Sequence, residues 1–129
     1  MVRILVSIQN GLLAEAMTAM LWESGEFEPF PVPVGSKNSN VVSECEMLAV
    51  QMALLEVSFG NGTTLETRLN EVKQIRRAVP NCKIVLLCDE NSAPNIAREV
   101  MLAKKDGLID GFFYSSVTAR YLLAALMAL

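Results

Sequence analysis

The residues that could carry chemistry stand at the ends of five short apolar runs. Ligands of an open parallel sheet bind outside the carboxyl ends of its strands, where the strand order reverses. In this chain of 129 residues, those ends carry Ile8, Gln9, Glu56, Cys88 and Ser115. These residues do not make up an acid, base and nucleophile set, so we expect no catalytic residue and no enzymatic activity.

The composition excludes several kinds of site. The chain has no histidine, which removes imidazole metal ligands, the usual general base of hydrolases and a simple pH switch near neutrality. Its three cysteines, Cys45, Cys82 and Cys88, form neither an even disulfide framework nor a closely spaced metal knuckle. We therefore expect reduced, partly buried thiols, no metal site and no cofactor.

Length, charge and hydropathy predict one domain over residues 1–129, located in the cytoplasm. Hydrophobic residues make up 52% of the chain, and Met1 leads straight into a strand pattern instead of a signal peptide. No apolar run approaches the roughly 18 residues that a membrane span needs. The formal net charge is -3, so no global positive field exists to hold a nucleic acid. We expect binding neither to membranes nor directly to nucleic acid.

Apolar periodicity predicts strands that alternate with helices. Strands are expected at 4–8, 27–33, 52–57, 83–88 and 109–114. Helices are expected at 12–24, 43 to about 50, 65–79, 94 to about 105, and after a Thr118 cap. Smaller signals are a capping box at 43–46, a Ser92 helix cap and a plain turn at 60–62. This alternation implies a parallel sheet with helices on both faces.

Two features of the pattern concern surfaces. Pro29, Pro31 and Pro33 place the second strand at a sheet edge, because proline cannot donate a ladder hydrogen bond. The third helix carries four basic residues that we expect on a solvated outer face rather than in a binding site: Arg68, Lys73, Arg76 and Arg77.

Three stretches resemble the receiver domain of two-component response regulators. They are Ile4-Leu5-Val6, Leu54-Leu55-Glu56-Val57, and the run from Gly111 through Phe112-Phe113-Tyr114-Ser115-Ser116 to Val117. The resemblance covers nearly the whole chain. It implies a flavodoxin-like (CheY-like), doubly wound α/β fold, with a five-stranded parallel sheet in the order 2-1-3-4-5. That order leaves the second strand at an edge, in agreement with its prolines.

In that family, two acidic residues after the first strand and an aspartate ending the third hold Mg²⁺, and that aspartate accepts a phosphoryl group from a histidine kinase. Here Ile8 and Gln9 occupy the first two positions, with Asn10 beside them, and Glu56 stands at the phosphoacceptor position. Isoleucine supplies no oxygen to Mg²⁺. Glutamate is one methylene longer than aspartate, so its carboxylate reaches a different point.

The remaining family positions differ as well. Cys88 replaces the hydroxyl residue that reads the phosphoryl oxygens, Ser115 replaces the lysine that neutralises the phosphate, and Ser116 replaces a proline. Phosphoryl transfer depends on positioning and on cations at the transferring group. With neither Mg²⁺ nor lysine at this edge, the resemblance implies a pseudo-receiver that keeps the fold without the chemistry.

Two site positions leave alternatives open. Glu56 either mimics a phosphorylated acceptor and fixes one signalling state, or is an exposed strand-end carboxylate without a role. Phe112 stands where the family has an aromatic residue that swings between buried and exposed positions. A phenylalanine has no hydroxyl to gain from exposure, which favours a fixed core position.

The function expected from the sequence is signalling by protein contact. The partner is a second copy, through helices four and five or one and five, or another protein, with a DNA-binding output domain outside this chain. The last helix has more apolar residues than one buried stripe requires and still reads apolar where the chain ends; we expect an interface at Tyr121, Leu122, Leu126 and Met127. The alternative is a small flavodoxin-like enzyme or ligand-binding protein that uses the strand-end crevice.

Overall fold

The computed structural model describes residues 1–33, 40–57, 64–88 and 94–129, so the expected turn at 60–62 and the Ser92 cap lie outside the described residues. The strands are β1 (Val2–Ser7), β2 (Phe27–Pro31), β3 (Met52–Val57), β4 (Lys83–Cys88) and β5 (Gly111–Tyr114). The helices are α1 (Gly11–Ser24), α2 (Val41–Leu48), α3 (Leu65–Ala78), α4 (Pro94–Lys105) and α5 (Ala119–Met127).

The five strands form one parallel sheet in the order β2-β1-β3-β4-β5, which confirms the expected topology. In the centre of the sheet, Ile4 lies opposite Met52, and Met52 lies opposite Lys83. Strand β2 lies at the edge of the sheet and pairs only with β1. An edge strand tolerates Pro29 and Pro31, which cannot donate ladder hydrogen bonds. All five carboxyl ends therefore point to the same side of the molecule.

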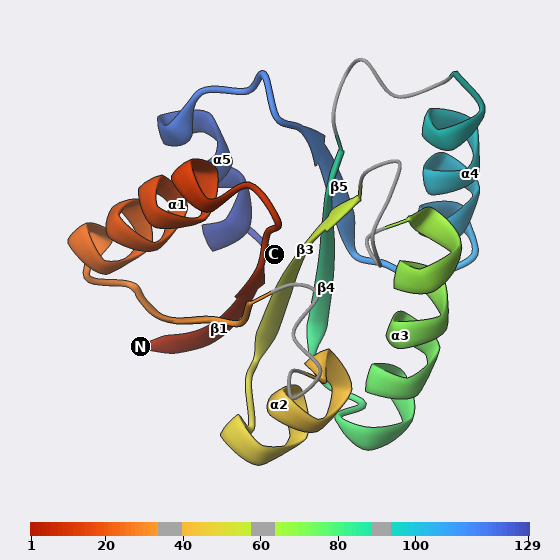
Figure 1. Ribbon diagram of the computed structural model, residues 1–129, viewed down its shortest axis with the longest axis horizontal. Helices are drawn as coiled ribbons and strands as arrows, with labels where there is room; N and C mark the ends of the chain where they lie inside the picture. Colours follow the sequence, from red (N-terminus) through yellow and green to blue (C-terminus); the bar gives the residue numbers. More distant parts are fainter. Residues whose placement is uncertain (34–39, 58–63, 89–93) are drawn as a thin grey trace.

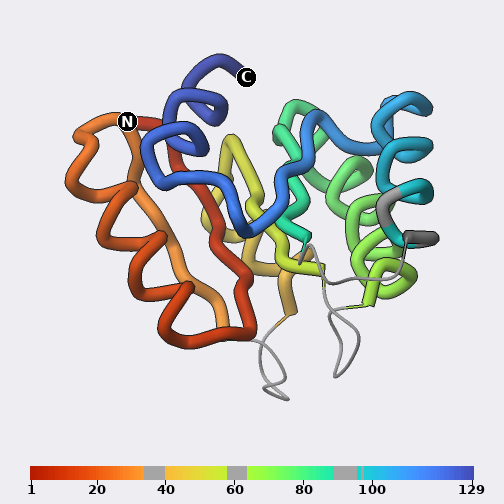
Figure 2. Tube along the Cα trace, turned by 90° about the horizontal axis from the view of Figure 1, so that it is seen from above, coloured from red at the N-terminus to blue at the C-terminus, as the bar shows by residue number. Residues whose placement is uncertain are grey.

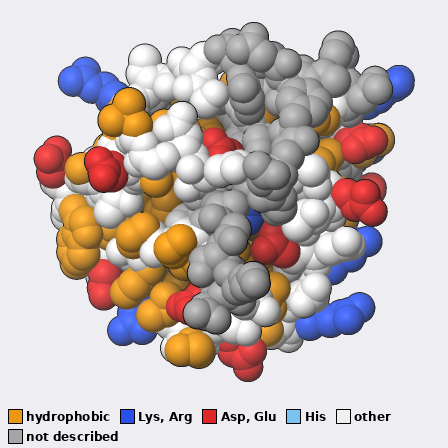
Figure 3. Space-filling view, in the orientation of Figure 1, with side chains coloured by type: hydrophobic (Ala, Val, Ile, Leu, Met, Phe, Trp, Pro, Cys, Tyr) orange, Lys and Arg blue, Asp and Glu red, His pale blue; other side chains and the backbone are white. Residues whose placement is uncertain are grey.

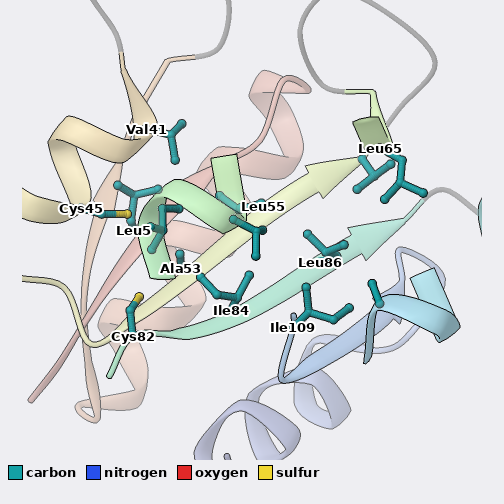
Figure 4. Close-up of a cluster of buried hydrophobic side chains, with 14 of the residues drawn as sticks. Leu5, Val41, Cys45, Ala53, Leu55, Leu65, Cys82, Ile84, Leu86 and Ile109 are labelled. Carbon is teal, nitrogen blue, oxygen red and sulfur yellow. The ribbon is translucent and has the colours of Figure 1, made fainter. Parts of the chain in front are cut away.

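Helices cover both faces of the sheet (Figures 1 and 2). Helices α1 and α5 lie on one face, and α2, α3 and α4 lie on the other. Alternate strand residues enter two separate cores, as the two-residue repeat of a strand requires. Leu5 and Leu55 pack towards α2 and α3 (Figure 4), whereas Ile4 and Leu54 pack in the core that contains α1 and α5.

Helix α2 begins earlier than the sequence indicated. Its cap is Asn40, whose side-chain oxygen accepts hydrogen bonds from the N–H groups of Val42 (3.0 Å) and Ser43 (3.2 Å). The capping box expected at Ser43 is therefore wrong. Starting the helix at Val41 places both Val41 and Cys45, four residues apart on one helix face, in the core.

The basic residues of α3 do not form one solvated face. Lys73 and Arg77 are exposed as expected, but Arg68 is only 1% exposed, and Arg76 is half-buried. The Arg76 guanidinium donates to the Asp110 carboxylate (2.8 Å) and also bonds two backbone carbonyls. The prediction of a solvated cluster is wrong for these two arginines because each has protein acceptors within reach.

Asp110 joins α3 to the start of the last two strands. Its Oδ2 accepts from Arg76 and from the Ile84 N–H (2.8 Å), while its own N–H donates to the Ile84 carbonyl (2.8 Å). These bonds also explain why β5 begins at Gly111, after Asp110, rather than at Ile109. One carboxylate thus satisfies a main-chain donor and a guanidinium.

Asp110→Ala should lower the free energy of unfolding by about 1–3 kcal/mol, because the Ile84 N–H loses its carboxylate acceptor and the Arg76 guanidinium keeps only its two carbonyl acceptors. Urea unfolding followed by circular dichroism measures the change. The matched control is Asp106→Ala at an exposed position, which should change stability by less than about 0.5 kcal/mol. Equal losses in the two variants would contradict the role assigned to Asp110.

Candidate functional site

The candidate site lies where β1 and β3 end. Ile8, at the first position where the resemblance implies an acidic residue, is 5% exposed and packs in the core of α1 and α5. Gln9 and Asn10 are exposed. The Asn10 side-chain oxygen accepts from the Leu13 N–H (3.1 Å) and caps α1, so the loop after β1 uses this polar side chain to start a helix.

Glu56 is half-buried near the end of β3 and bridges to the chain after β1. Its Oε1 accepts a hydrogen bond from the Gln9 N–H at 2.8 Å. The bond crosses from β3 to β1, the two strands between which the resemblance implies a Mg²⁺ site. A carboxylate held by a main-chain donor there has one oxygen committed to the protein.

A buried arginine lies beneath this bridge. Arg68 Nε donates to the Glu56 carbonyl (2.7 Å), and one terminal nitrogen donates to both the carbonyl and the hydroxyl of Ser7, each at 3.0 Å. The other terminal nitrogen pairs with the Glu71 carboxylate at 3.1 Å. The guanidinium therefore ties the ends of β1 and β3 to α3 through three hydrogen bonds, and a fourth joins it to Glu71 within α3.

The charge on Arg68 is balanced from within the protein. Burial lowers the pKa of Arg68 from its usual value, while the carboxylate of Glu71, through its charge and hydrogen bond, and then the charge of Glu56 raise it. Planar guanidinium groups satisfy several acceptors at fixed angles, which suits a buried junction of this kind. Positive charge is thus present below the site, yet it is committed to protein acceptors.

Sequence reasoning missed Arg68, although a signal for it existed. Leu65, Arg68, Val72 and Ile75 follow one another at intervals of three and four residues, and all four are the buried residues of α3. Their spacing places Arg68 on the buried stripe of the helix. The charge of Arg68 led to the expectation of a solvated side chain, and its position on the buried stripe was not taken into account.

The ends of β4 and β5 offer weak polar groups. Cys88 is 2% exposed, and burial raises the pKa of its thiol to about 11, so it stays protonated at neutral pH. The Ser115 N–H donates to the Cys88 carbonyl (2.9 Å), and the side chains of Ser115 and Ser116 are exposed. All three cysteines are free, and they are buried more completely than the partial burial expected from the sequence.

Phe112 is half-buried and packs on the core between the sheet and the α3 layer. The Lys104 ammonium lies 5.9 Å from the centre of its ring, and the Tyr114 ring meets it edge-on with centres 6.3 Å apart. These contacts come from α4 and β5 and fit a fixed position. Whether Phe112 moves during signalling stays a prediction.

The expectation of an interface on α5 is wrong for two of the four residues. Leu122 and Leu126 are 3% and 1% exposed and pack in the core under α1 and α5, so they cannot line a surface. They occupy the single buried stripe that α5 needs. Tyr121 and Met127 remain exposed, at 60% and 53%.

Two further findings concern ligands and membranes. Among the described residues, no group of three or more Cys, Asp and Glu side chains is placed to hold a metal ion. Within the same part of the chain, every helix is too short or too polar to cross a bilayer. A cavity of about 510 Å³ lies away from the site, at the opposite end of the sheet, and is lined by residues that include Val2, Phe27 and Lys83.

Comparisons with known proteins identify the fold. No protein-family model and no curated protein matches the chain. Among solved structures, a LuxR-family DNA-binding response regulator from Staphylococcus aureus has a TM-score of 0.77 at 14% identity, over 99% of this chain and 98% of that chain. The chemotaxis protein CheY4 from Vibrio cholerae has a TM-score of 0.75 at 15% identity, over 99% and 98%.

The fold also occurs in a Burkholderia thailandensis protein named for pilus assembly, with a TM-score of 0.68 at 13% identity over 99% of this chain and 97% of that chain. These identities are low, and the likeness rests on topology and shape across the full length. The sheet order and the five helices agree with it. The chain therefore has the CheY-like flavodoxin fold of response-regulator receiver domains.

Proposed function

We propose that this chain is a receiver-fold signalling module that acts through protein contact and does not use Mg²⁺-dependent aspartyl phosphorylation. The observation that carries the proposal is the 2.8 Å hydrogen bond from the Gln9 N–H to Glu56 Oε1. It joins the two strand ends directly across the position where a receiver would bind its metal ion. A metal ion there would meet a carboxylate with one oxygen already committed to the protein.

The groups around that bond support the same proposal. Ile8 is buried and has no oxygen to offer, Asn10 caps a helix, and Arg68 is committed to four acceptors. Mg²⁺ prefers several carboxylate or water oxygens in octahedral geometry. Within the described residues, Glu56 is the one carboxylate at the ends of β1 and β3.

The position of Glu56 bears on its two interpretations. Glu56 is half-buried and accepts a main-chain hydrogen bond, which supports a role at the site over an exposed carboxylate without one. We infer that Glu56 fixes the geometry of the site permanently, as the phosphorylation-mimic interpretation requires. The signalling state would then be constant, and regulation would act on what the module binds.

The output belongs to this proposal as well. The fold neighbours include a DNA-binding response regulator and a protein named for pilus assembly, so the partner can be a transcriptional output domain or part of a surface assembly. We propose a cytoplasmic protein that reaches either output by contact. A protein partner fits an acidic chain better than direct nucleic-acid binding does.

Incubation with acetyl phosphate and Mg²⁺ should leave the intact mass of the protein unchanged, because the described residues place neither a set of metal ligands nor an uncommitted cation at the acceptor position. A receiver domain with its complete acidic set, treated in parallel, should gain one phosphoryl group. A mass gain in the wild-type chain that disappears in Glu56→Gln would overturn the proposal.

Arg68→Met should destabilise the protein by about 2–4 kcal/mol, because it removes the buried donors that Arg68 supplies to the carbonyls of Ser7 and Glu56 and to the Glu71 carboxylate. Urea unfolding measures the loss. The matched control is Arg77→Met on the exposed side of the same helix, with an expected change under about 0.5 kcal/mol. A loss in Arg68→Met no larger than in the control would mean that the arginine does not hold the strand ends together.

Of the two self-association interfaces expected from the sequence, α4 with α5 or α1 with α5, we propose the first, with Tyr121 in place of the buried Leu126. Exposed apolar side chains on these helices include Met101, Leu102 and Tyr121, at 59%, 52% and 60%. Sedimentation should show a dimer at micromolar concentration and a monomer for Tyr121→Glu. Trp22→Glu on α1 should remain dimeric, and a wild-type monomer throughout would refute the dimer.

A further inference from the structure

Helix α1 is apolar on more faces than the fold can cover. Its 14 residues include only two charged side chains, Glu15 and Glu23, yet only Met17 and Leu21 are buried. Leu12 is 80% exposed and Trp22 is 50% exposed. A helix that is apolar all round is normally buried on all sides, so the uncovered side of α1 marks an interaction surface.

The uncovered side contains a groove between α1 and the edge strand β2. The groove has a volume of about 330 Å³, and its lining is almost entirely apolar: Ala14, Glu15, Thr18, Ala19, Trp22 and Pro31. The Thr18 hydroxyl donates to the Ala14 carbonyl at 2.7 Å, so this polar group is satisfied within the helix. Small side chains and a partly exposed tryptophan give a site for an apolar anchor.

The surroundings of the groove are acidic. Glu15 and Glu23 lie on α1 and Glu26 precedes β2, and neither α1 nor β2 contains a lysine or an arginine. Over the flank formed by α1, hydrophobic side chains lie among carboxylates (Figure 3). Of the 11 Lys and Arg residues in the chain, only Arg3 and Lys37 precede Arg68. The negative charge is therefore concentrated near this groove and does not simply follow from the net charge of the whole chain.

We propose that the α1–β2 groove, defined by these six lining residues, docks an amphipathic helical segment of another protein that carries apolar anchors flanked by lysine or arginine. The apolar anchor fills the groove beside Trp22, and the flanking cations face Glu15 and Glu23. Helix α1 is about 21 Å long at the usual rise per residue, which offers a partner helix a matching length. This recognition follows the helix-in-groove mode, with charge setting the choice of partner.

The charges at the rim argue against two other occupants. A second copy docked through the same face would bring Glu15 and Glu23 against their own equivalents, and like charges in contact cost affinity. A bilayer with anionic headgroups would be repelled for the same reason. The groove is also separate from the Glu56 site, so the proposal does not depend on whether the chain is phosphorylated.

Trp22 is the only tryptophan in the chain, so its fluorescence reports on the groove directly. The probe is a helical peptide as long as α1, built from leucine and lysine with its leucines on one face; the control peptide has glutamate in place of every lysine. The leucine-lysine peptide should shift the Trp22 emission to shorter wavelength in a saturable manner, and the control peptide should not. No shift, or an equal shift with both peptides, would overturn the proposal.

Matched variants distinguish binding at the groove from general attraction of the peptide to an acidic protein. Glu15→Lys with Glu23→Lys should weaken binding of the leucine-lysine peptide about tenfold or more, whereas Glu44→Lys with Glu46→Lys, the same charge change on α2, should alter it less than about twofold. Equal weakening by both pairs would reduce the effect to nonspecific attraction and overturn the proposal.

A second pair of variants tests the groove by shape. Ala19→Arg fills the groove and should abolish the emission shift. Ala78→Arg, at an exposed position on α3, should leave the shift unchanged. Retained binding in Ala19→Arg would overturn the proposal. Sedimentation of Trp22→Glu beside the wild type checks that no second copy occupies the groove, because an α4–α5 dimer persists in both.

Discussion

The rest of the candidate site depends on one buried charge, the guanidinium of Arg68. A cation in a protein interior persists only when all its donors meet acceptors, since desolvation otherwise costs more than the contacts return. Here the acceptors come from Ser7, Glu56 and Glu71, which lie on β1, β3 and α3. The same bonds fix where β1 and β3 end, and so they set the reach of the Glu56 carboxylate to the Gln9 N–H.

The sheet could be predicted from sequence because its signals are local. Runs of apolar residues marked the central strands, and Pro29 and Pro31 marked the edge, so the strand order followed once the resemblance was recognised. The cap of α2 could not be settled in this way. Asn40 and Ser43 are both good caps, and the choice between them depends on which helix start buries Val41 against the sheet.

The site was predicted less well because its residues act through long-range contacts. The sequence located Glu56 at a strand end but could not show that its partner would be the main chain of Gln9. It also could not tell which apolar residues of α5 the core would cover, and so Leu122 and Leu126 were expected at an interface. For Arg68 the helical spacing was sufficient, and the error came from weighing charge above position.

A site held in this way changes what kind of signalling is possible. A switch needs two conformations of similar free energy, and a ligand shifts them only by binding one better than the other. Losing the Arg68 bonds would leave several buried polar groups unpaired, so an alternative arrangement of β1 and β3 lies well above the observed one in free energy. Under the proposed function, the module therefore transmits information through which partner binds its surface, and not through a change of state at the strand ends. Selection then acts on the surfaces of α1, α4 and α5, and this agrees with the location of the exposed apolar side chains on these helices.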